Sequence, residues 1–245
     1  MAMHLHQVVP FGRSLDEYRA MFSLSPDDLD KEIIGVADGP ASFNAEMMAY
    51  GKRVMSVDPL YAFSAAEIKQ RFYAVVDGII RQITETPNDW VWTFHQSPEQ
   101  LRERRIQVLN RFLTDYEQGK VDGRYVIGEL PRLDCSDAQF QLALCSHFLF
   151  LYSDHFSYEF HRAALTEMLR IAVEVRVFPL LTLALKPSPY LVPLLEDLAS
   201  AGYHHEIRRV PYELQRGGNQ MLCIRRGAPT AQLDVAPPEL RYEPS

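Results

Sequence analysis

The chain has 245 residues, of which 47% are hydrophobic and 23% are charged, and its formal net charge is −7. This length and composition predict one large folded domain and exclude a disordered or fibrous chain. The acidic balance argues against nucleic acid or an anionic membrane surface as a partner of the whole chain.

The cysteines and the first residues bear on location. Cys135, Cys145 and Cys223 share no C-x-x-C spacing, so we expect neither a disulfide framework nor a thiolate zinc site. The amino-terminal residues lack the layout of a signal peptide. No apolar stretch reaches the roughly 18 residues that a membrane span needs. The predicted location is therefore a reducing cytoplasm, with no membrane partner.

Helix caps and hydrophobic periodicity predict most of the secondary structure. Ser14 with Glu17, and Ser64 with Glu67, have the spacing of capping boxes. Short apolar runs bounded by turn residues predict buried strands. In chain order, the expected elements are a helix over 14–22, a strand over 33–37, a helix over 43–50, a strand over 53–57, helices over 64–86 and 97–119, strands over 125–127 and 140–145, a helix over 157–172, a strand over 174–181, a helix over 188–202 and strands over 205–213 and 220–226.

This alternation predicts an α/β fold that is Rossmann-like, with a mostly parallel seven-stranded sheet, helices on both faces and a helical insert. The folded domain is expected over 1–226. Within it, 64–120 holds two long helices more than a nucleotide-binding fold requires, and we interpret them as an inserted lid or cap beside the site. Residues 227–245 hold four prolines without periodicity and are predicted to form a loose tail.

The predicted helix over 97–119 carries a run of positive charge. A run of this kind is typical of a solvated helix face, and an anion-attracting rim is the alternative. The arginines concerned are Arg102, Arg104, Arg105 and Arg111.

The strand, small-residue turn, helix and strand over 33–57 have the order that a nucleoside-binding unit needs. Asp58 ends the second strand and is placed to accept both ribose hydroxyl protons. Only Gly39 stands where a dinucleotide fingerprint has three glycines, and Ala41 holds the second of those places. A buried βαβ unit without a ligand is the alternative.

Six motifs in a fixed order make the chain similar to class I S-adenosylmethionine-dependent methyltransferases, and more narrowly to a bacterial branch of that family. The motifs are PFGR followed by E-Y at 10–18, DGPASFN at 38–44, VDP at 57–59, CSHFLFLYS at 145–153, E-x-R-x-F-P-L-L at 174–181 and GGN-x-ML at 217–222. The resemblance implies S-adenosylmethionine bound over the carboxyl ends of the strands. It also implies methyl transfer to a small-molecule acceptor by in-line displacement.

The resemblance further implies a set of residues that bind the cofactor: Asp38, Gly39, Pro40, Ala41, Ser42, Asp58, Pro59, Glu129, Leu130 and Ser146. Ala37 stands where most methyltransferases have an acid, which leaves the role of Asp38 toward the methionine amino group open. The chain has no N-P-P-Y tetrapeptide after the fourth strand, and this absence disfavours adenine and glutamine side chains as acceptors.

His147 is the candidate catalytic residue, because it follows the strand over 140–145 almost directly and an imidazole titrates near neutrality. It is expected to take a proton from the acceptor or to orient it. The alternative is a histidine that only bonds backbone at the end of a buried strand.

Four residues are candidates for acceptor contacts: Arg13, Tyr18, Tyr152 and Arg176. A guanidinium suits bidentate pairing with a carboxylate. For Arg176, an ion pair with Glu174 is the alternative. The spacings of His155 with His161, and of the histidines near the amino terminus, predict no metal site.

The sequence leaves three functions open, in falling order of preference. They are an enzyme that methylates a small molecule, a non-catalytic protein that binds S-adenosylmethionine or S-adenosylhomocysteine, and a nicotinamide-dependent oxidoreductase. The missing glycines count against the third, because a pyrophosphate needs close backbone approach. The acceptor, the attacking atom and the oligomeric state stay open.

Overall fold

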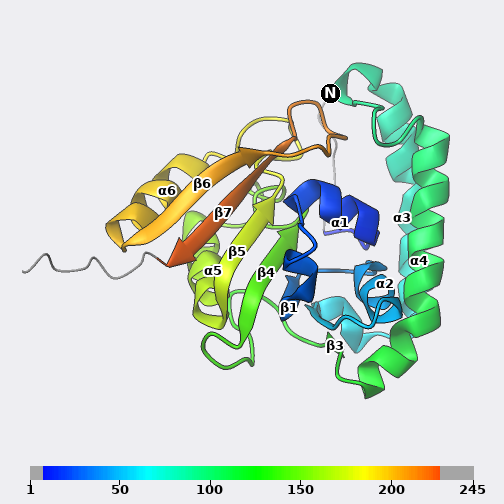
Figure 1. Ribbon diagram of the computed structural model, residues 1–245. Coiled ribbons are helices and arrows are strands. Elements are labelled where there is room, and N and C mark those ends of the chain that lie inside the picture. The colour runs from blue at the N-terminus through cyan, green and yellow to red at the C-terminus, as the bar shows by residue number, and fades with distance from the viewer. Residues whose placement is uncertain (1–7, 227–245) are drawn as a thin grey trace, which may run out of the picture.

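The computed structural model describes residues 8–226, and the predicted tail at 227–245 lies outside the described residues. Seven strands form one sheet in the order β3-β2-β1-β4-β5-β7-β6 (Figure 1). The strands are β1 (Ile33–Val36), β2 (Val54–Val57), β3 (Tyr125–Val126), β4 (Phe140–Ser146), β5 (Ala172–Phe178), β6 (Tyr203–Arg209) and β7 (Gln220–Arg226).

The helices alternate with the strands along the chain. They are α1 (Leu15–Phe22), α2 (Phe43–Ala49), α3 (Ala65–Glu85), α4 (Pro98–Val121), α5 (Tyr158–Ile171) and α6 (Leu191–Ser200), with short 3-10 turns η1 (Asp28–Asp30), η2 (Pro59–Ala62) and η3 (Pro87–Asp89). The capping boxes at Ser14 and Ser64 both form. These starts are therefore predicted correctly.

The sheet is parallel from β3 through β5, and β7 runs antiparallel to both β5 and β6. The chain leaves β1 in one direction through β2 and β3, then returns to β4 on the other side of β1. The gap between β1 and β4 is thus the topological switch point, over which ligands bind in sheets of this kind. The predicted α/β fold is confirmed.

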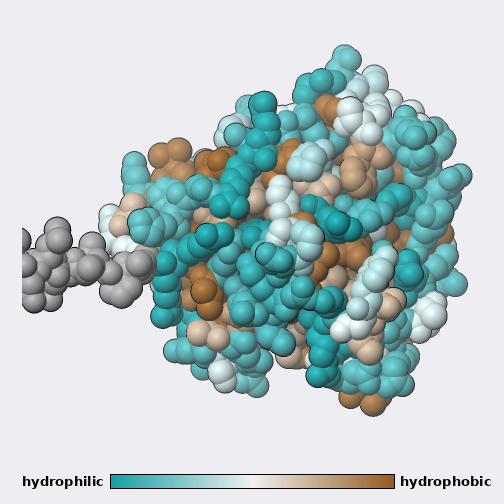
Figure 2. Space-filling model, viewed as in Figure 1, coloured by the Kyte–Doolittle hydropathy of each residue, from teal (hydrophilic) through white to brown (hydrophobic). Residues whose placement is uncertain are grey.

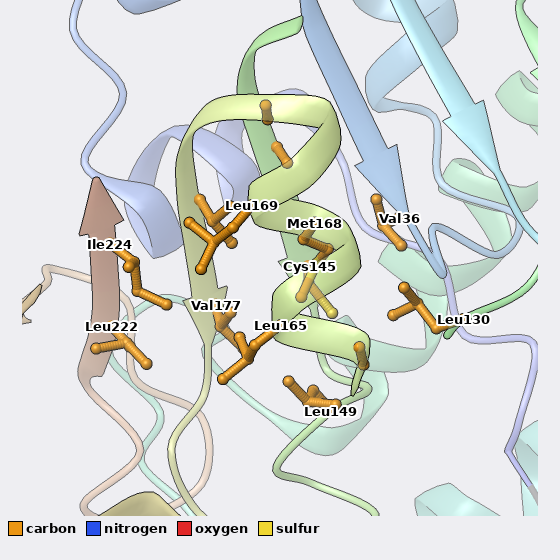
Figure 3. Packing of buried hydrophobic residues seen from close by; sticks show 14 of the residues in the cluster. Val36, Leu130, Cys145, Leu149, Leu165, Met168, Leu169, Val177, Leu222 and Ile224 are labelled. Carbon is orange, nitrogen blue, oxygen red and sulfur yellow. The ribbon is translucent and has the colours of Figure 1, made fainter. Parts of the chain in front are cut away.

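Alternate residues of each strand pack on opposite faces, as the two-residue period of a strand requires. On one face, Ile34 and Cys145 pack with α5 and α6, where the side chains of Leu165 and Met168 point toward the sheet (Figure 3). On the other face, residues including Leu144 pack with α1, α2 and part of α3. The sheet is therefore covered on both sides.

The predicted insert is the pair α3 and α4, which run side by side along one flank of the molecule (Figure 1). Phe72 of α3 and Phe112 of α4 are fully buried in the cluster between them. The prediction that the arginines of α4 form a solvated face is wrong for Arg105, which is 1% exposed, although Arg111 is exposed. The reason is a buried carboxylate partner, Glu17.

Some element ends differ from the prediction. β5 stops at Phe178, and β6 ends at Arg209 rather than at 213. Pro179 and Pro211 follow these ends, and a proline has no amide proton to donate to a sheet. The visible surface is mostly hydrophilic, with hydrophobic residues in small scattered patches (Figure 2). No helix within residues 8–226 has both the length and the apolar character to cross a bilayer.

Candidate functional site

Two adjoining cavities lie where β1, β2 and β4 end. We name them the main cavity, of about 470 Å³, and the side cavity, of about 380 Å³. Both fall within the range typical of small-molecule sites. They share part of their lining, so they are continuous at these residues: Val8, Ala37, Asp58, Pro59 and Phe148.

The turn after β1 brings a carboxylate to the main cavity. Ala37 and Gly39 both have a left-handed backbone, with φ of 54° and 55°, and Asp38 between them turns back against the strand. A Cβ atom on Gly35 would lie 2.4 Å from Oδ2 of Asp38. Glycine is therefore required at position 35, inside a strand.

Hydrogen bonds hold the Asp38 carboxylate on both oxygens. The hydroxyl of Tyr18 donates to Oδ1, and Oγ of Ser56 donates to Oδ2 at 2.6 Å. Burial raises the pKa of Asp38 to about 6 in spite of these donors. Tyr18 and Asp38, both predicted as site residues, thus meet at one wall of the main cavity.

Asp58 lies at the junction of the two cavities. Its Oδ2 accepts from the amide of Gly39, and its Oδ1 accepts from the amide of Leu60, both at 2.8 Å. Each oxygen can accept a further proton, because a carboxylate has about four lone-pair sites. Burial raises the pKa of Asp58 to about 6. Pro59, which follows it, lines both cavities.

The amino-terminal segment 10–13 covers the turn that follows Gly39. The amide of Ser42 donates to the carbonyl of Arg13 at 3.1 Å. A Cβ on Gly12 would come within 2.0 Å of the Pro40 carbonyl oxygen, so only glycine fits there. Pro40, Ala41 and Ser42 line neither cavity, because this segment covers them instead of a ligand.

The side cavity has mostly apolar walls. Glu129 and Leu130 line it as the sequence predicts, together with Phe156 and Phe160. Flat apolar rings suit a cavity of this composition, because aromatic side chains pack well against them. These two phenylalanines, from the start of α5 and the loop before it, are not predicted as site residues.

His147 lies at the end of β4 and lines the main cavity beside Ser146. Its backbone is left-handed, with φ of 52°, and its amide donates to the carbonyl of Phe178 at 2.6 Å. Nδ1 is 2.9 Å from Oγ of Ser146. Burial and the nearby Arg13 hold the pKa of His147 well below its ordinary value. The imidazole is therefore neutral at pH 7.

Beside His147 lies a buried polar group that we name the Glu17 cluster: Arg13, Glu17, His95, Arg105 and Tyr212. Arg105 donates to both carboxylate oxygens of Glu17, at 2.8 Å for Nη1 and Oε2. The Tyr212 hydroxyl donates to Oε1 at 3.1 Å. Mainly because of Arg105, the pKa of Glu17 stays well below its usual range against the opposing effect of burial.

The other two predicted acceptor contacts, Tyr152 and Arg176, do not line the main cavity. The hydroxyl of Tyr152 accepts from the amide of Val9 at 3.3 Å, and the ring lines a small inner cavity of about 80 Å³ that adjoins the main one. Arg176 lines none of the three cavities. It donates to both oxygens of Asp28 at 3.0 Å and to Glu174 at 2.6 Å, which is the structural ion pair given as the alternative.

The insert forms one wall of the main cavity. Val75 and Arg71 of α3 line it, and the guanidinium of Arg71 lies 3.8 Å from the ring centroid of Phe63. None of these three is a predicted site residue, because the sequence shows only the helical period of α3 and does not show that the helix start and Phe63 face the cavity. The interpretation of the insert as a lid stays a prediction. Among residues 8–226, no group of three potential metal ligands gathers.

No family model matches the chain. The uncharacterized protein MJ0045 of Methanocaldococcus jannaschii is 31% identical to it over 225 residues, which cover 91% of this chain and 99% of that protein. That relative is archaeal, so a purely bacterial branch is not confirmed.

Two solved structures are similar in fold. Magnesium protoporphyrin IX methyltransferase from Synechocystis PCC 6803 with bound SAM has a TM-score of 0.46 at 12% identity, covering 87% of this chain and 78% of that chain. A SAM-dependent methyltransferase from Methanosarcina mazei has a TM-score of 0.42 at 13% identity, covering 84% and 99%. At these values the similarity carries no information about substrate.

Proposed function

This chain belongs to the family of the Methanocaldococcus jannaschii protein MJ0045, and we propose that it is a class I S-adenosylmethionine-dependent methyltransferase acting on a small molecule. The single observation that carries the proposal is Asp58. A half-buried carboxylate ends β2 at the junction of two ligand-sized cavities, beside the switch point of the sheet. A nucleoside needs an acceptor of ribose hydroxyls at this place.

The residues present fit the cofactor. Asp58 would accept the ribose hydroxyls on its remaining lone pairs. The side cavity, with Glu129, Leu130 and Phe160, would hold the adenine ring, and Gly39 with Asp38 would lie nearest the amino-acid end. When bound, S-adenosylmethionine supplies a methyl group on an electrophilic sulfonium.

The covered turn argues against a dinucleotide. A pyrophosphate binds at the start of the helix after β1, where backbone amides are free. Here the carbonyl of Arg13 takes the Ser42 amide, and the segment 10–13 packs so closely that Gly12 admits no side chain against Pro40. This packing disfavours the oxidoreductase.

The chain's own residues would do three things for the transfer. The walls of the main cavity bring the acceptor into line, and alignment supplies most of the acceleration for a displacement. Neutral His147 orients the attacking group by a hydrogen bond on Nε2. Because its pKa is so low, it serves as a base only toward an acceptor that is itself acidic.

Calorimetry with purified protein tests the proposal. We expect saturable binding of S-adenosylhomocysteine and none of NAD or NADP. Asp58→Ala should weaken S-adenosylhomocysteine binding by roughly 1.5–3 kcal/mol, the value of a hydrogen bond to a charged group. Glu67→Ala, at the exposed start of α3, is the matched loss of a carboxylate and should leave the affinity unchanged. Tight NAD binding would reverse the assignment.

Turnover separates an enzyme from a binding protein. Small-molecule mixtures incubated with the protein and methyl-labelled S-adenosylmethionine should yield a labelled product. If His147 takes the proton of an acidic acceptor, His147→Ala should lower that rate about 10²–10⁴-fold with cofactor affinity kept. If it only orients the acceptor, His147→Asn should recover much of the rate. Cofactor binding without any labelled product would favour the non-catalytic alternative.

A further inference from the structure

Arg13 is a buried cation whose hydrogen-bonding capacity is not used up. It is 9% exposed, and its Nη1 donates to the carbonyls of Phe11 and Gly12. Within residues 8–226, its Nε is buried without a hydrogen-bond partner. A buried charge that is not fully compensated is costly to folding, so a ligand that brings an opposite charge to the part of Arg13 that lines the cavities is favoured.

The nearest acid is already saturated. Glu17 lies 3.9 Å from Nε of Arg13, but its Oε1 and Oε2 are taken by both terminal nitrogens of Arg105. The amide of Ser14 and the hydroxyl of Tyr212 donate to it as well. Two guanidinium charges therefore share one carboxylate.

The two histidines and the tyrosine beside Arg13 add no negative charge at neutral pH. The pKa of His147 and that of His95 are lowered by burial, so both imidazoles are neutral. Burial raises the pKa of the Tyr212 hydroxyl, which stays protonated. Asp38 also lines the main cavity and is mostly ionised at neutral pH, but its two oxygens already accept from Tyr18 and Ser56. The Glu17 cluster thus carries one excess positive charge.

Position separates this charge from the nucleoside end. Arg13 and His147 line both the main cavity and the inner cavity. Asp58 lines the main cavity and the side cavity, and it does not reach the inner one. Arg13 and Asp58 therefore stand at opposite junctions, with the main cavity between them.

We propose that the acceptor is a small organic anion whose carboxylate binds Arg13 at the junction of the main and inner cavities. This inference rests on the proposed function and names its substrate class. The carboxylate binds the part of the guanidinium that lines the two cavities and neutralises the excess charge. The inner cavity is walled mainly by apolar side chains, including Ile83, Trp90 and Leu214, and it takes a compact apolar part of the same molecule.

The probes are benzoate and benzamide, which have nearly the same shape and differ in charge. With the protein saturated by S-adenosylhomocysteine, calorimetry should give benzoate at least tenfold tighter binding than benzamide. Arg13→Gln should remove that advantage and leave benzamide unchanged. Equal binding of the two probes to the unaltered protein overturns the proposal, and so does a benzoate advantage that survives in Arg13→Gln.

Arg111→Gln is the matched control. Arg111 is exposed on α4 and pairs loosely with Glu46 at 3.6 Å, so its loss removes the same charge away from the cavities. Benzoate binding should stay within twofold of the unaltered protein. If Arg13→Gln does not fold, Arg13→Lys replaces it, since an ammonium keeps the charge without the fork. A several-fold weaker benzoate complex is then expected, and an unchanged one overturns the proposal.

The carboxylate of the cofactor itself is the competing occupant. S-Adenosylhomocysteine and 5′-methylthioadenosine, which lacks the carboxylate, distinguish the two. If Arg13 serves the acceptor, the ratio of their affinities is the same in the unaltered protein and in Arg13→Gln. A ratio that collapses in the variant assigns Arg13 to the cofactor and overturns the proposal. Failure of S-adenosylhomocysteine to bind any form would instead contradict the proposed function.

Discussion

Two buried arginines on the same face of the sheet differ in how their charge is matched. Arg176 on β5 is 3% exposed and has two carboxylates, with Asp28 on two terminal nitrogens and Glu174 on Nε. Arg13 has only a share in Glu17, and its Nε has no partner among the described residues. The first arginine is closed off from ligands, and the second lines two cavities.

The contrast separates a structural charge from a charge available to a ligand. Both side chains are buried, so burial alone does not distinguish them. What distinguishes them is whether the protein itself supplies enough acid. A complete set of partners holds Arg176 between η1 and β5, whereas an incomplete set leaves Arg13 with affinity for an anion.

The largest expected effect on stability comes from removing Arg176, which pairs with Asp28 and Glu174. Arg176→Met leaves Asp28 and Glu174 buried with weakened compensation, and we expect unfolding in urea to show a loss of about 3–5 kcal/mol. Arg225→Met is the control, because Arg225 pairs with the same Glu174 at 3.0 Å but is half exposed. It should cost about 1 kcal/mol or less. Similar losses for both would remove the distinction drawn above.

The next effect concerns the affinity for the cofactor and depends on Asp58, which lines the main and side cavities. A ribose hydroxyl forms its strongest hydrogen bond with Asp58 while that group is ionised, and burial raises the pKa of Asp58 to about 6. Affinity for S-adenosylhomocysteine should therefore be constant above about pH 7 and fall as the pH drops through 6, by at most about 1.4 kcal/mol per pH unit. Calorimetry between pH 7.5 and 5 measures this. Asp58→Asn should bind more weakly with a flatter profile, and a flat profile in the unaltered protein would contradict the assignment.

A smaller effect should appear in the stability of the protein at low pH. The pKa of His147 is lowered in the folded state by burial and by Arg13, so the unfolded chain binds the proton more tightly. Its contribution is full above about pH 6.5 and is lost as the pH falls toward 5.5, by about 1 kcal/mol.

His147→Asn tests this contribution, because asparagine tolerates the left-handed backbone at this position. The difference in unfolding free energy between the two proteins should shrink by that amount from pH 7.5 to 5.5. An unchanged difference would place the imidazole in a solvated setting.

The smallest expected effect on stability comes from removing Arg13, in contrast to the large effect of removing Arg176. Arg13→Gln removes hydrogen bonds to two carbonyls but also removes repulsion from Arg105, the largest charge effect that lowers the pKa of Arg13. We expect a change in unfolding free energy below about 1 kcal/mol. A loss as large as that of Arg176→Met would show that Arg13 is structural after all.

Much of the fold follows from local signals. Ser14 and Ser64 cap the helices that the sequence predicts, and the buried strands appear where apolar runs stand between turn residues. The ends of two strands are predicted less well, because the predicted strands run on through Pro179 and Pro211. In the structure β5 and β6 end one and two residues before these prolines. The predicted site residues that line the cavities, Asp38, Asp58 and His147 among them, sit at strand ends, where topology alone brings them together.

The remainder of the site depends on contacts over long sequence distances. Glu17 completes the capping box of α1, as the sequence predicts. Nothing in the neighbouring sequence indicates that it also pairs with Arg105 of α4. The segment 10–13 has no periodicity, so its place over the turn at Pro40 is not predictable. The sequence indicates one partner of Arg176, because Glu174 stands two residues before it, but it does not indicate Asp28, which lies on η1.

The long reach of the Glu17 cluster has a consequence for synthesis. The carbonyl of Gly12 accepts a hydrogen bond from Arg105, which is 93 positions later in the chain. Glu17 accepts a hydrogen bond from the hydroxyl of Tyr212, which is 195 positions later in the chain. At translation rates of about 5–20 residues per second, roughly 10–40 s pass between the emergence of Glu17 and that of Tyr212. Gly12 and Glu17 are therefore among the first residues made and among the last to gain these hydrogen-bond partners.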